Sequence, residues 1–194
     1  MRRIFDVVKQ QVLEFLHGEG CSISTIGRFL KYSKTTIGRW IANAAGAYNH
    51  EVEMLPGQKY EADELRTFVG NKKNECWIMY SLNQTTKSIV SFCIGRRTKE
   101  NLQKVTDKIL CYTPKMIYTD RLPMYGSLIP KSTHTVRKRK TNIIERRNGQ
   151  LRLQLRRLNR RTICFSRSET MLRYSFLLYL KYVTTGSENY KFVL

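Results

Sequence analysis

The sequence predicts an α/β domain that follows a small all-helical domain. Apolar residues in the first 45 positions recur at steps of three and four, as they do along helices. From Lys59 onward the apolar residues alternate with polar ones, as they do along strands. The third observation is the element order after Lys59, in which three successive strands precede a helix, a strand and later helices. With 194 residues the chain has room for a core domain and an accessory domain.

The composition suggests where these domains meet. Small residues, Pro56 and Gly57 gather after the helical region and are typical of a linker. The last residues lack a clear periodic pattern and are expected to be loosely held. The expected division is a helical domain over residues 1–45, a linker over 46–58, an α/β domain over 59–183 and a tail over 184–194.

The helical domain is expected to contain three helices. An apolar stripe indicates the first (Phe5, Val8, Val12 and Phe15). Ser22 and Ser33 are suitable N-caps for the second and third. A helix, a short turn and a helix are typical of a helix-turn-helix DNA-binding motif. The polar residues expected to face DNA from the third helix are Lys34, Thr35, Thr36 and Arg39. The alternative is a three-helix bundle with a solvated polar face.

Alternation predicts the strands of the second domain within residues 59–70, 75–83 and 87–97, with turns at 71–74 and 83–86. Later strands are expected at 115–120 and 133–136, and helices at 98–111, from Thr141 onward and at 168–183. Three antiparallel strands, a helix, a strand and later helices are the order of a ribonuclease-H-like α/β domain. The fold class is therefore a mixed five-stranded sheet with helices, preceded by the all-α domain.

Three acidic residues are the candidate catalytic and metal-binding side chains. Asp63 lies in the first strand, Asp120 ends the strand at 115–120, and Glu145 opens a helix. Glu145 is also the one acid among twelve Lys or Arg between residues 131 and 161. Carboxylates that meet from two strands and a helix could hold two divalent metals against a phosphodiester. Singly, each acid has a structural alternative, such as a turn or a helix-dipole contact.

The charge of the chain indicates its partner. The sequence carries 35 Lys and Arg against 15 Asp and Glu, a net charge of +20. Such an excess favours a nucleic acid. No apolar run reaches the roughly 20 residues that span a bilayer, and the scattered charges at the start do not form a signal peptide. We therefore expect a cytoplasmic protein. Four arginines of the helix that begins near Thr141 are further candidates for DNA binding: Arg146, Arg152, Arg156 and Arg160.

The five cysteines are widely spaced and form no CxxC pair. None of the three histidines is close in sequence to a cysteine pair. A zinc ribbon or finger is therefore not expected. We expect the cysteines to be reduced, buried thiols instead.

Three segments resemble transposases of the bacterial insertion-sequence-one (IS-one) family: YEADELRTFVGNKKNECWIMYSLN, IYTDRLPMYGSLIP and IIERRNGQLRLQLRRLNRRTICFSRSETM. The separation of 25 positions between Asp120 and Glu145 is also similar to this family. The resemblance runs from about Lys59 to Val183. It implies a catalytic triad of Asp63, Asp120 and Glu145 that holds two Mg²⁺ ions, for which Mn²⁺ is a possible substitute.

The resemblance also implies a function. The protein would bind the terminal inverted repeats of a mobile element as double-stranded DNA and free a 3′-hydroxyl by metal-dependent cleavage. That hydroxyl would then attack target DNA. The protein would act as a homodimer or higher oligomer on DNA of the bacterial nucleoid. It would need neither a membrane nor a small-molecule substrate.

The sequence departs from the family in two places. Longer members carry a cysteine-rich zinc-binding segment before the helix-turn-helix, and this sequence contains none. Some members have a further acid in the last helix, where this sequence has Arg173, Tyr174 and Ser175. Two alternatives to a transposase remain open, namely a non-catalytic helix-turn-helix regulator and a ribonuclease-H-like nuclease or resolvase.

Overall fold

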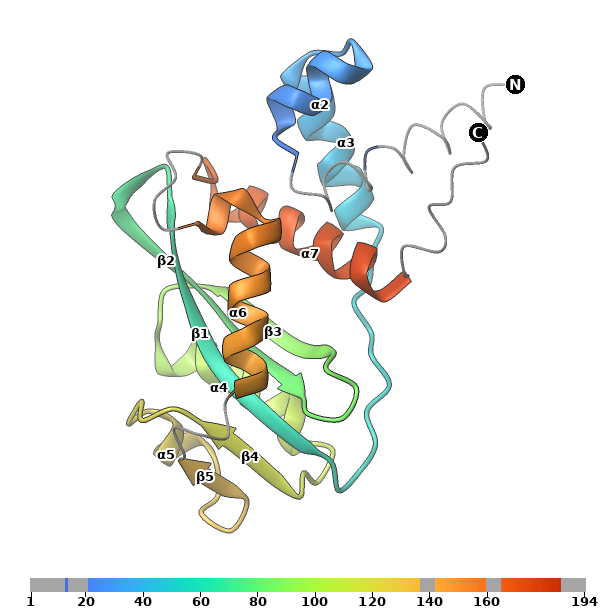
Figure 1. Cartoon of the computed structure of the whole chain (residues 1–194). Helices are drawn as coiled ribbons and strands as arrows, with labels where there is room; N and C mark the ends of the chain where they lie inside the picture. The colour runs from blue at the N-terminus through green and yellow to red at the C-terminus, as the bar shows by residue number, and fades with distance from the viewer. Residues whose placement is uncertain (1–12, 14–20, 137–141, 160–164, 186–194) are drawn as a thin grey trace. The chain divides into compact units, whose positions relative to one another are not determined.

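The computed structural model describes residue 13 and residues 21–136, 142–159 and 165–185. The chain divides into two compact units. Figure 1 labels their helices and strands. One unit, here called the sheet unit, is Glu51–Leu151; the other, the helical unit, combines Met1–His50 with Arg152–Leu194. The expected division assigned the last helix to the α/β domain, whereas in the structure this helix belongs to the helical unit.

The sheet unit is built on a five-stranded sheet in the order β3-β2-β1-β4-β5. β1 pairs antiparallel with β2, and β2 with β3, whereas β4 runs parallel to both β1 and β5. Its strands are β1 (Lys59–Val69), β2 (Asn71–Asn83), β3 (Ile89–Gly95), β4 (Met116–Thr119) and β5 (His134–Val136). Three antiparallel strands followed by two parallel ones make the mixed sheet of a ribonuclease-H-like fold, as the sequence predicts.

The turn between β1 and β2 lies where the sequence places it, although β2 already begins at Asn71. The Asn71 side chain accepts the backbone N–H groups of Lys73 and Asn74, and the pairing jumps here from Phe68 with Glu75 to Val69 with Asn71. Gly70 precedes this segment with a φ of 75°, which favours glycine. The second turn is where the sequence places it, since the Asn83 side chain accepts the backbone N–H groups of Thr85 and Thr86.

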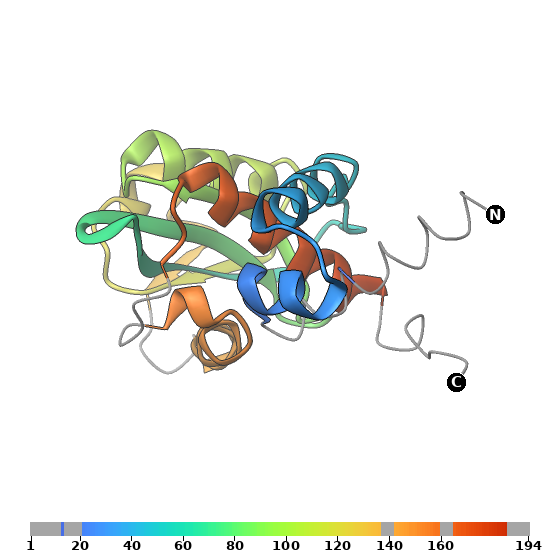
Figure 2. The same cartoon turned by 90° about the horizontal axis from the view of Figure 1, so that it is seen from above.

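Helices cover both faces of this sheet (Figure 2). On one face, α4 (Lys99–Leu110) and α5 (Tyr125–Leu128) share an apolar core with β1, whose contribution includes Tyr60 and Ala62. On the other face lies α6 (Asn142–Gln154). The Tyr80 hydroxyl of β2 donates to Asn148 of α6 at 2.8 Å, which fixes this helix against the sheet.

The helical unit contains a helix, a short turn and a second helix. α2 (Ile23–Leu30) and α3 (Lys34–Gly46) begin at the expected caps. The Ser22 hydroxyl accepts the backbone N–H of Thr25, and the Ser33 hydroxyl accepts that of Thr36. The turn is tight: a Cβ on Gly27 would lie 2.8 Å from the Tyr32 carbonyl oxygen, so the position requires glycine. The expected first helix lies almost wholly outside the described residues.

The last helix, α7 (Glu169–Thr185), packs against α3. Leu178 of α7 is fully buried in one cluster with Leu13, Ile26 and Ile37. This shared apolar core explains why α7 belongs to the helical unit. Within the described ranges, no helix is both long enough and apolar enough to cross a membrane.

The arginine-rich segment is not one continuous helix. α6 ends at Gln154, Leu155 adopts a non-helical backbone, and Arg156–Leu158 form the short 3-10 helix η1. The expectation that one helix carries both Arg152 and Arg156 is therefore wrong, because Arg152 lies in α6 and Arg156 in η1. The Arg152 guanidinium, in the last turn of α6, donates to the carbonyl of Leu158 in η1 at 3.1 Å. Arg160 lies outside the described residues.

Candidate metal centre

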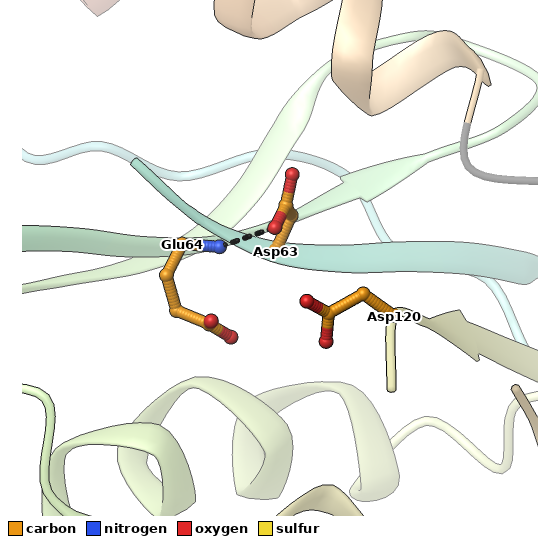
Figure 3. A group of neighbouring side chains, drawn as sticks. All are labelled: Asp63, Glu64 and Asp120. Atoms are coloured by element: carbon orange, nitrogen blue, oxygen red, sulfur yellow. Dashed lines mark hydrogen bonds between the residues drawn. The ribbon is translucent and has the colours of Figure 1, made fainter. Parts of the chain in front are cut away.

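Three carboxylates of the sheet unit form a compact group. One oxygen each from Asp63, Glu64 and Asp120 lies within 4.8 Å of the other two (Figure 3). The parallel pairing of β1 with β4 explains the meeting, because Ala62 lies opposite Thr119 and the two aspartates come directly after these residues. Asp63 and Glu64 are half-buried, and Asp120 is exposed.

Alternation along β1 sends its acids to opposite faces of the sheet. Glu61 lies on the α6 face, where its carboxylate accepts the Ile144 N–H at 2.8 Å and the Gln84 amide at 2.7 Å. Glu61 is only 1% exposed, so it is occupied as a structural acceptor. Glu64 lies on the α4 face and turns its carboxylate toward Asp120 (Figure 3).

Each carboxylate of the group is oriented by a hydrogen bond. Asp63 accepts the Asn148 amide at 2.7 Å and the backbone N–H of Glu64 at 2.8 Å. The buried Tyr125 hydroxyl donates to Glu64. Asp120 accepts the Leu122 N–H at 2.9 Å, which shapes the turn after β4. Fixed carboxylates of this kind can act together on one ligand.

The protonation of the group reflects burial and crowding. Burial, with the charges of Asp120 and Glu145, raises the pKa of Asp63 to about 6. Burial also raises the pKa of Glu64 to about 7, with Asp120 and Asp63 adding to the effect. Neighbouring carboxylates oppose one another's ionisation, and a bound cation would relieve this repulsion.

Of the three acids expected at the site, the structure brings two into direct proximity. Asp63 and Asp120 are in the group, while Glu145 is exposed in the first turn of α6 and is not one of its members. Glu145 is near enough for its charge to raise the pKa of Asp63. Glu64 is the member that sequence reasoning missed. Its position next to Asp63 in the sequence could have indicated it, but strand alternation predicts that Glu64 lies on the opposite face of the sheet from Asp63.

The chemistry of the group fits a hard divalent cation. Mg²⁺ binds carboxylate oxygens, often through only one or two carboxylates together with water and substrate phosphate. Asp63, Glu64 and Asp120 offer such oxygens from neighbouring strands, and Glu145 adds a fourth carboxylate nearby.

The expected DNA-binding residues lie in both units. Lys34 and Thr35 line a pocket of the helical unit together with Arg156. Arg39 is exposed on α3, and Arg146 is exposed on α6.

Thr36, the fourth residue expected to face DNA, also takes part in the cap of α3. Its hydroxyl lies 2.9 Å from the Ser33 hydroxyl. Thr36 therefore supports the start of this helix.

A mixed sheet of this order with carboxylates on β1 and after β4 defines a ribonuclease-H-like domain with an acidic centre. A family model described as IS1 transposase matches residues 58–181. The chain belongs to the IS1 transposase family, of the acid-triad (DDE) type.

Individual relatives agree with this assignment. The chain is 37% identical over 108 residues to the insertion element iso-IS1n protein InsB of Shigella dysenteriae, covering 56% of this chain and 82% of that protein. It is 32% identical over 108 residues to the insertion element IS1 protein InsB of Shigella flexneri, with the same coverage.

Among solved structures, the HTLV-2 integrase catalytic core domain in complex with magnesium superposes with a TM-score of 0.41 and 13% identity. The superposition covers 64% of this chain and 86% of that one. Similarity at this level adds nothing to the assignment, which rests on the strand order and on the family match.

Proposed function

We propose that the protein is a metal-dependent transposase that cleaves the ends of an insertion sequence and joins them to target DNA. The observation that carries the proposal is the meeting of Asp63 and Asp120 across the parallel β1–β4 pair in a member of this family. In the first step water attacks the phosphodiester at the end of the element, and the 3′-oxygen leaves as a 3′-hydroxyl. That hydroxyl then attacks a phosphodiester of the target, forms a new bond to its phosphorus and displaces the 3′-oxygen of the target strand.

The proposed metal ligands are Asp63 and Asp120, completed by Glu145, with Glu64 beside them. Two Mg²⁺ ions, or Mn²⁺ in their place, would supply Lewis-acid stabilisation of the attacking and leaving oxygens. The protein's own part is to hold the carboxylates in position. Asn148 orients Asp63, and Tyr125 orients Glu64.

Glu61 has a positioning role in this proposal. Its carboxylate binds the Ile144 N–H, one residue before Glu145, and so fixes the start of α6 against β1. The first N–H groups of a helix lack partners within the helix, and Glu61 supplies one from the sheet. This contact therefore fixes the backbone position from which the Glu145 side chain extends.

Recognition of DNA is proposed for the helix-turn-helix and the arginines. Arg39, exposed on α3, would read base edges of the terminal inverted repeat. The net charge of +20 favours attraction to the phosphate backbone. We propose at least a dimer on nucleoid DNA, because two ends must be joined and each chain contributes one acidic centre.

The two alternatives are less well supported. A regulator needs no oriented group of carboxylates, and this structure holds three of them with dedicated hydrogen bonds. A nuclease or resolvase would cut a duplex without joining its 3′-hydroxyl to a second one.

The test uses a labelled duplex carrying an end of the element and a separate target duplex. With Mg²⁺, the wild-type protein should cut the end and produce a longer, joined product. Cleavage without any joined product would favour a nuclease, and binding without cleavage would favour a regulator.

A further inference from the structure

The helical unit contains a pocket that the carboxylates play no part in forming. The pocket has a volume of about 640 Å³. Its described walls are the start of α2, the first turn of α3, residues 155–157 at η1, and residues 165–171 before and at the start of α7. All of these residues belong to the helical unit.

The pocket is strongly cationic. Lys34 contributes from α3, Arg156 and Arg157 from η1, and Arg167 from the segment before α7. Among the described residues that line it, there is no Asp or Glu. Four positive charges around one cavity repel one another, and an anionic ligand would reverse that unfavourable interaction.

Neutral hydrogen-bonding groups accompany these charges. Thr35 and Ser166 contribute hydroxyl groups, and the Arg157 guanidinium donates to the Ser166 hydroxyl at 3.2 Å. This bond orients one guanidinium of the wall. Planar guanidinium groups match the oxygens of a phosphate with paired hydrogen bonds.

The size of the pocket indicates what kind of anion it fits. A water molecule takes about 30 Å³ in the liquid, so this pocket exceeds the needs of a single small ion many times over. Besides the cationic and hydroxyl groups, Leu155 and Met171 add apolar surface to its walls. A length of sugar-phosphate backbone offers both kinds of surface.

We propose that this pocket holds one backbone segment of duplex DNA, with Lys34 and Thr35 on one side and Arg156 and Arg167 on the other. The inference rests on the proposed function, and it adds a composite site. The segment after α6 and the helix-turn-helix would contact the same strand, so sequence reading and phosphate binding are not divided between separate parts of the chain.

Fluorescence anisotropy of full-length protein with the element-end duplex tests the proposal. The variants are Lys34→Ala, Arg156→Ala, Arg167→Ala and the double variant Lys34→Ala/Arg156→Ala. Lys108→Ala on α4 also removes one exposed positive charge but lies in the other unit and does not line the pocket, so it serves as the control.

Each single pocket variant should weaken DNA binding about tenfold and lower the salt slope by about 0.9 for each lost phosphate contact. The double variant should lose less than the product of the two single losses, because both side chains contact one backbone segment. The control should keep the wild-type slope. Pocket variants that bind like the control would overturn the proposal.

Alkylation of native cysteines provides a readout that requires no substitution. Cys21 lines the pocket and is half-buried, whereas Cys111 is exposed at the end of α4. Bound duplex should slow alkylation of Cys21, measured by peptide mass spectrometry, while Cys111 reacts at its free rate. Equal protection of both thiols, or of neither, would contradict the proposal.

Three further outcomes separate the hypotheses. Wild-type protein that nicks and joins DNA while the pocket variants bind normally would overturn the pocket alone. Wild-type protein that binds no duplex would overturn both the pocket and the proposed function. Protection of Cys21 by inorganic phosphate but not by duplex would assign the pocket to free phosphate groups and would also overturn the DNA proposal.

Discussion

The carboxylate of Glu61 on β1 accepts the backbone N–H of Ile144 in α6 at 2.8 Å. Two elements far apart in sequence are thereby joined one residue before Glu145. Burial raises the pKa of Glu61, although the bonds from Ile144 and Gln84 oppose that shift. The contact makes a buried acid of the first strand a support for the start of α6, next to the proposed metal ligand Glu145.

Replacing Glu61 should therefore weaken the docking of α6. Glu61→Ala leaves the Ile144 N–H without its acceptor, and an unmade bond of this kind costs about 1–3 kcal/mol in the free energy of unfolding. Glu61→Gln keeps an acceptor oxygen and should lose less. Urea unfolding measures both. Equal stability of Glu61→Ala and the wild type would show that the contact does not hold the helix.

A second prediction concerns Glu64 and Tyr125. If Glu64 helps to hold Mg²⁺ and Tyr125 orients it, Tyr125→Phe should reduce metal affinity about 10- to 100-fold, the usual effect of losing such a support. Isothermal calorimetry with Mg²⁺ measures this. Tyr112→Phe, at an exposed tyrosine outside the group, is the control. Unchanged affinity in both Tyr125→Phe and Glu64→Gln would exclude Glu64 from the metal site.

The raised pKa values predict how stability depends on pH without metal. The folded protein holds protons on Asp63 and Glu64 up to about pH 6 and 7, whereas their ordinary values are 3.8 and 4.5. This contribution to stability is fully present below those ordinary values and is lost as pH rises through 6 and 7.

The Tm of the metal-free wild type should therefore fall between pH 5 and pH 8 relative to the double variant Asp63→Asn/Glu64→Gln. Saturating Mg²⁺ should stabilise the wild type more at pH 8 than at pH 5, because binding requires ionised carboxylates. A difference in Tm between wild type and double variant that does not change with pH would contradict the assigned shifts.

Sequence preference should depend on α3. Arg39→Ala should reduce the discrimination between an element end and random DNA by about 1–3 kcal/mol, since a good contact to a base edge contributes that much. Competition binding at one salt concentration measures the ratio. Lys104→Ala, an exposed cation on α4, controls for net charge. An unchanged ratio for Arg39→Ala would place sequence recognition elsewhere.

The strands were predictable where alternation is regular. β1, β3 and β4 follow the predicted segments closely because each has one face in an apolar core. The meeting of Asp63 and Asp120 was predictable as well, once β4 was assumed to lie beside β1. The prediction of one helix through Arg152 and Arg156 failed because nothing in the helical period signals the break at Leu155.

The packing of α7 and the position of Glu64 were beyond local patterns. α7 is apolar enough to pack in either unit, and its packing on α3, with Leu178 buried in the cluster around Ile37, places it in the helical unit. Glu64 comes close to Asp120 through its longer side chain, although strand alternation separates it from Asp63. Both features depend on three-dimensional contacts between segments distant in sequence.

The most direct test of the central claim is strand cleavage and joining with an end duplex and Mg²⁺, comparing wild type with Asp63→Asn, Asp120→Asn and Glu145→Gln. Asp107→Asn, an exposed acid of α4, is the control. The three site variants should bind the duplex at least as tightly as the wild type, since each removes negative charge, yet give no cut or joined product. The control should remain active. Full cleavage and joining by Asp120→Asn would contradict the account.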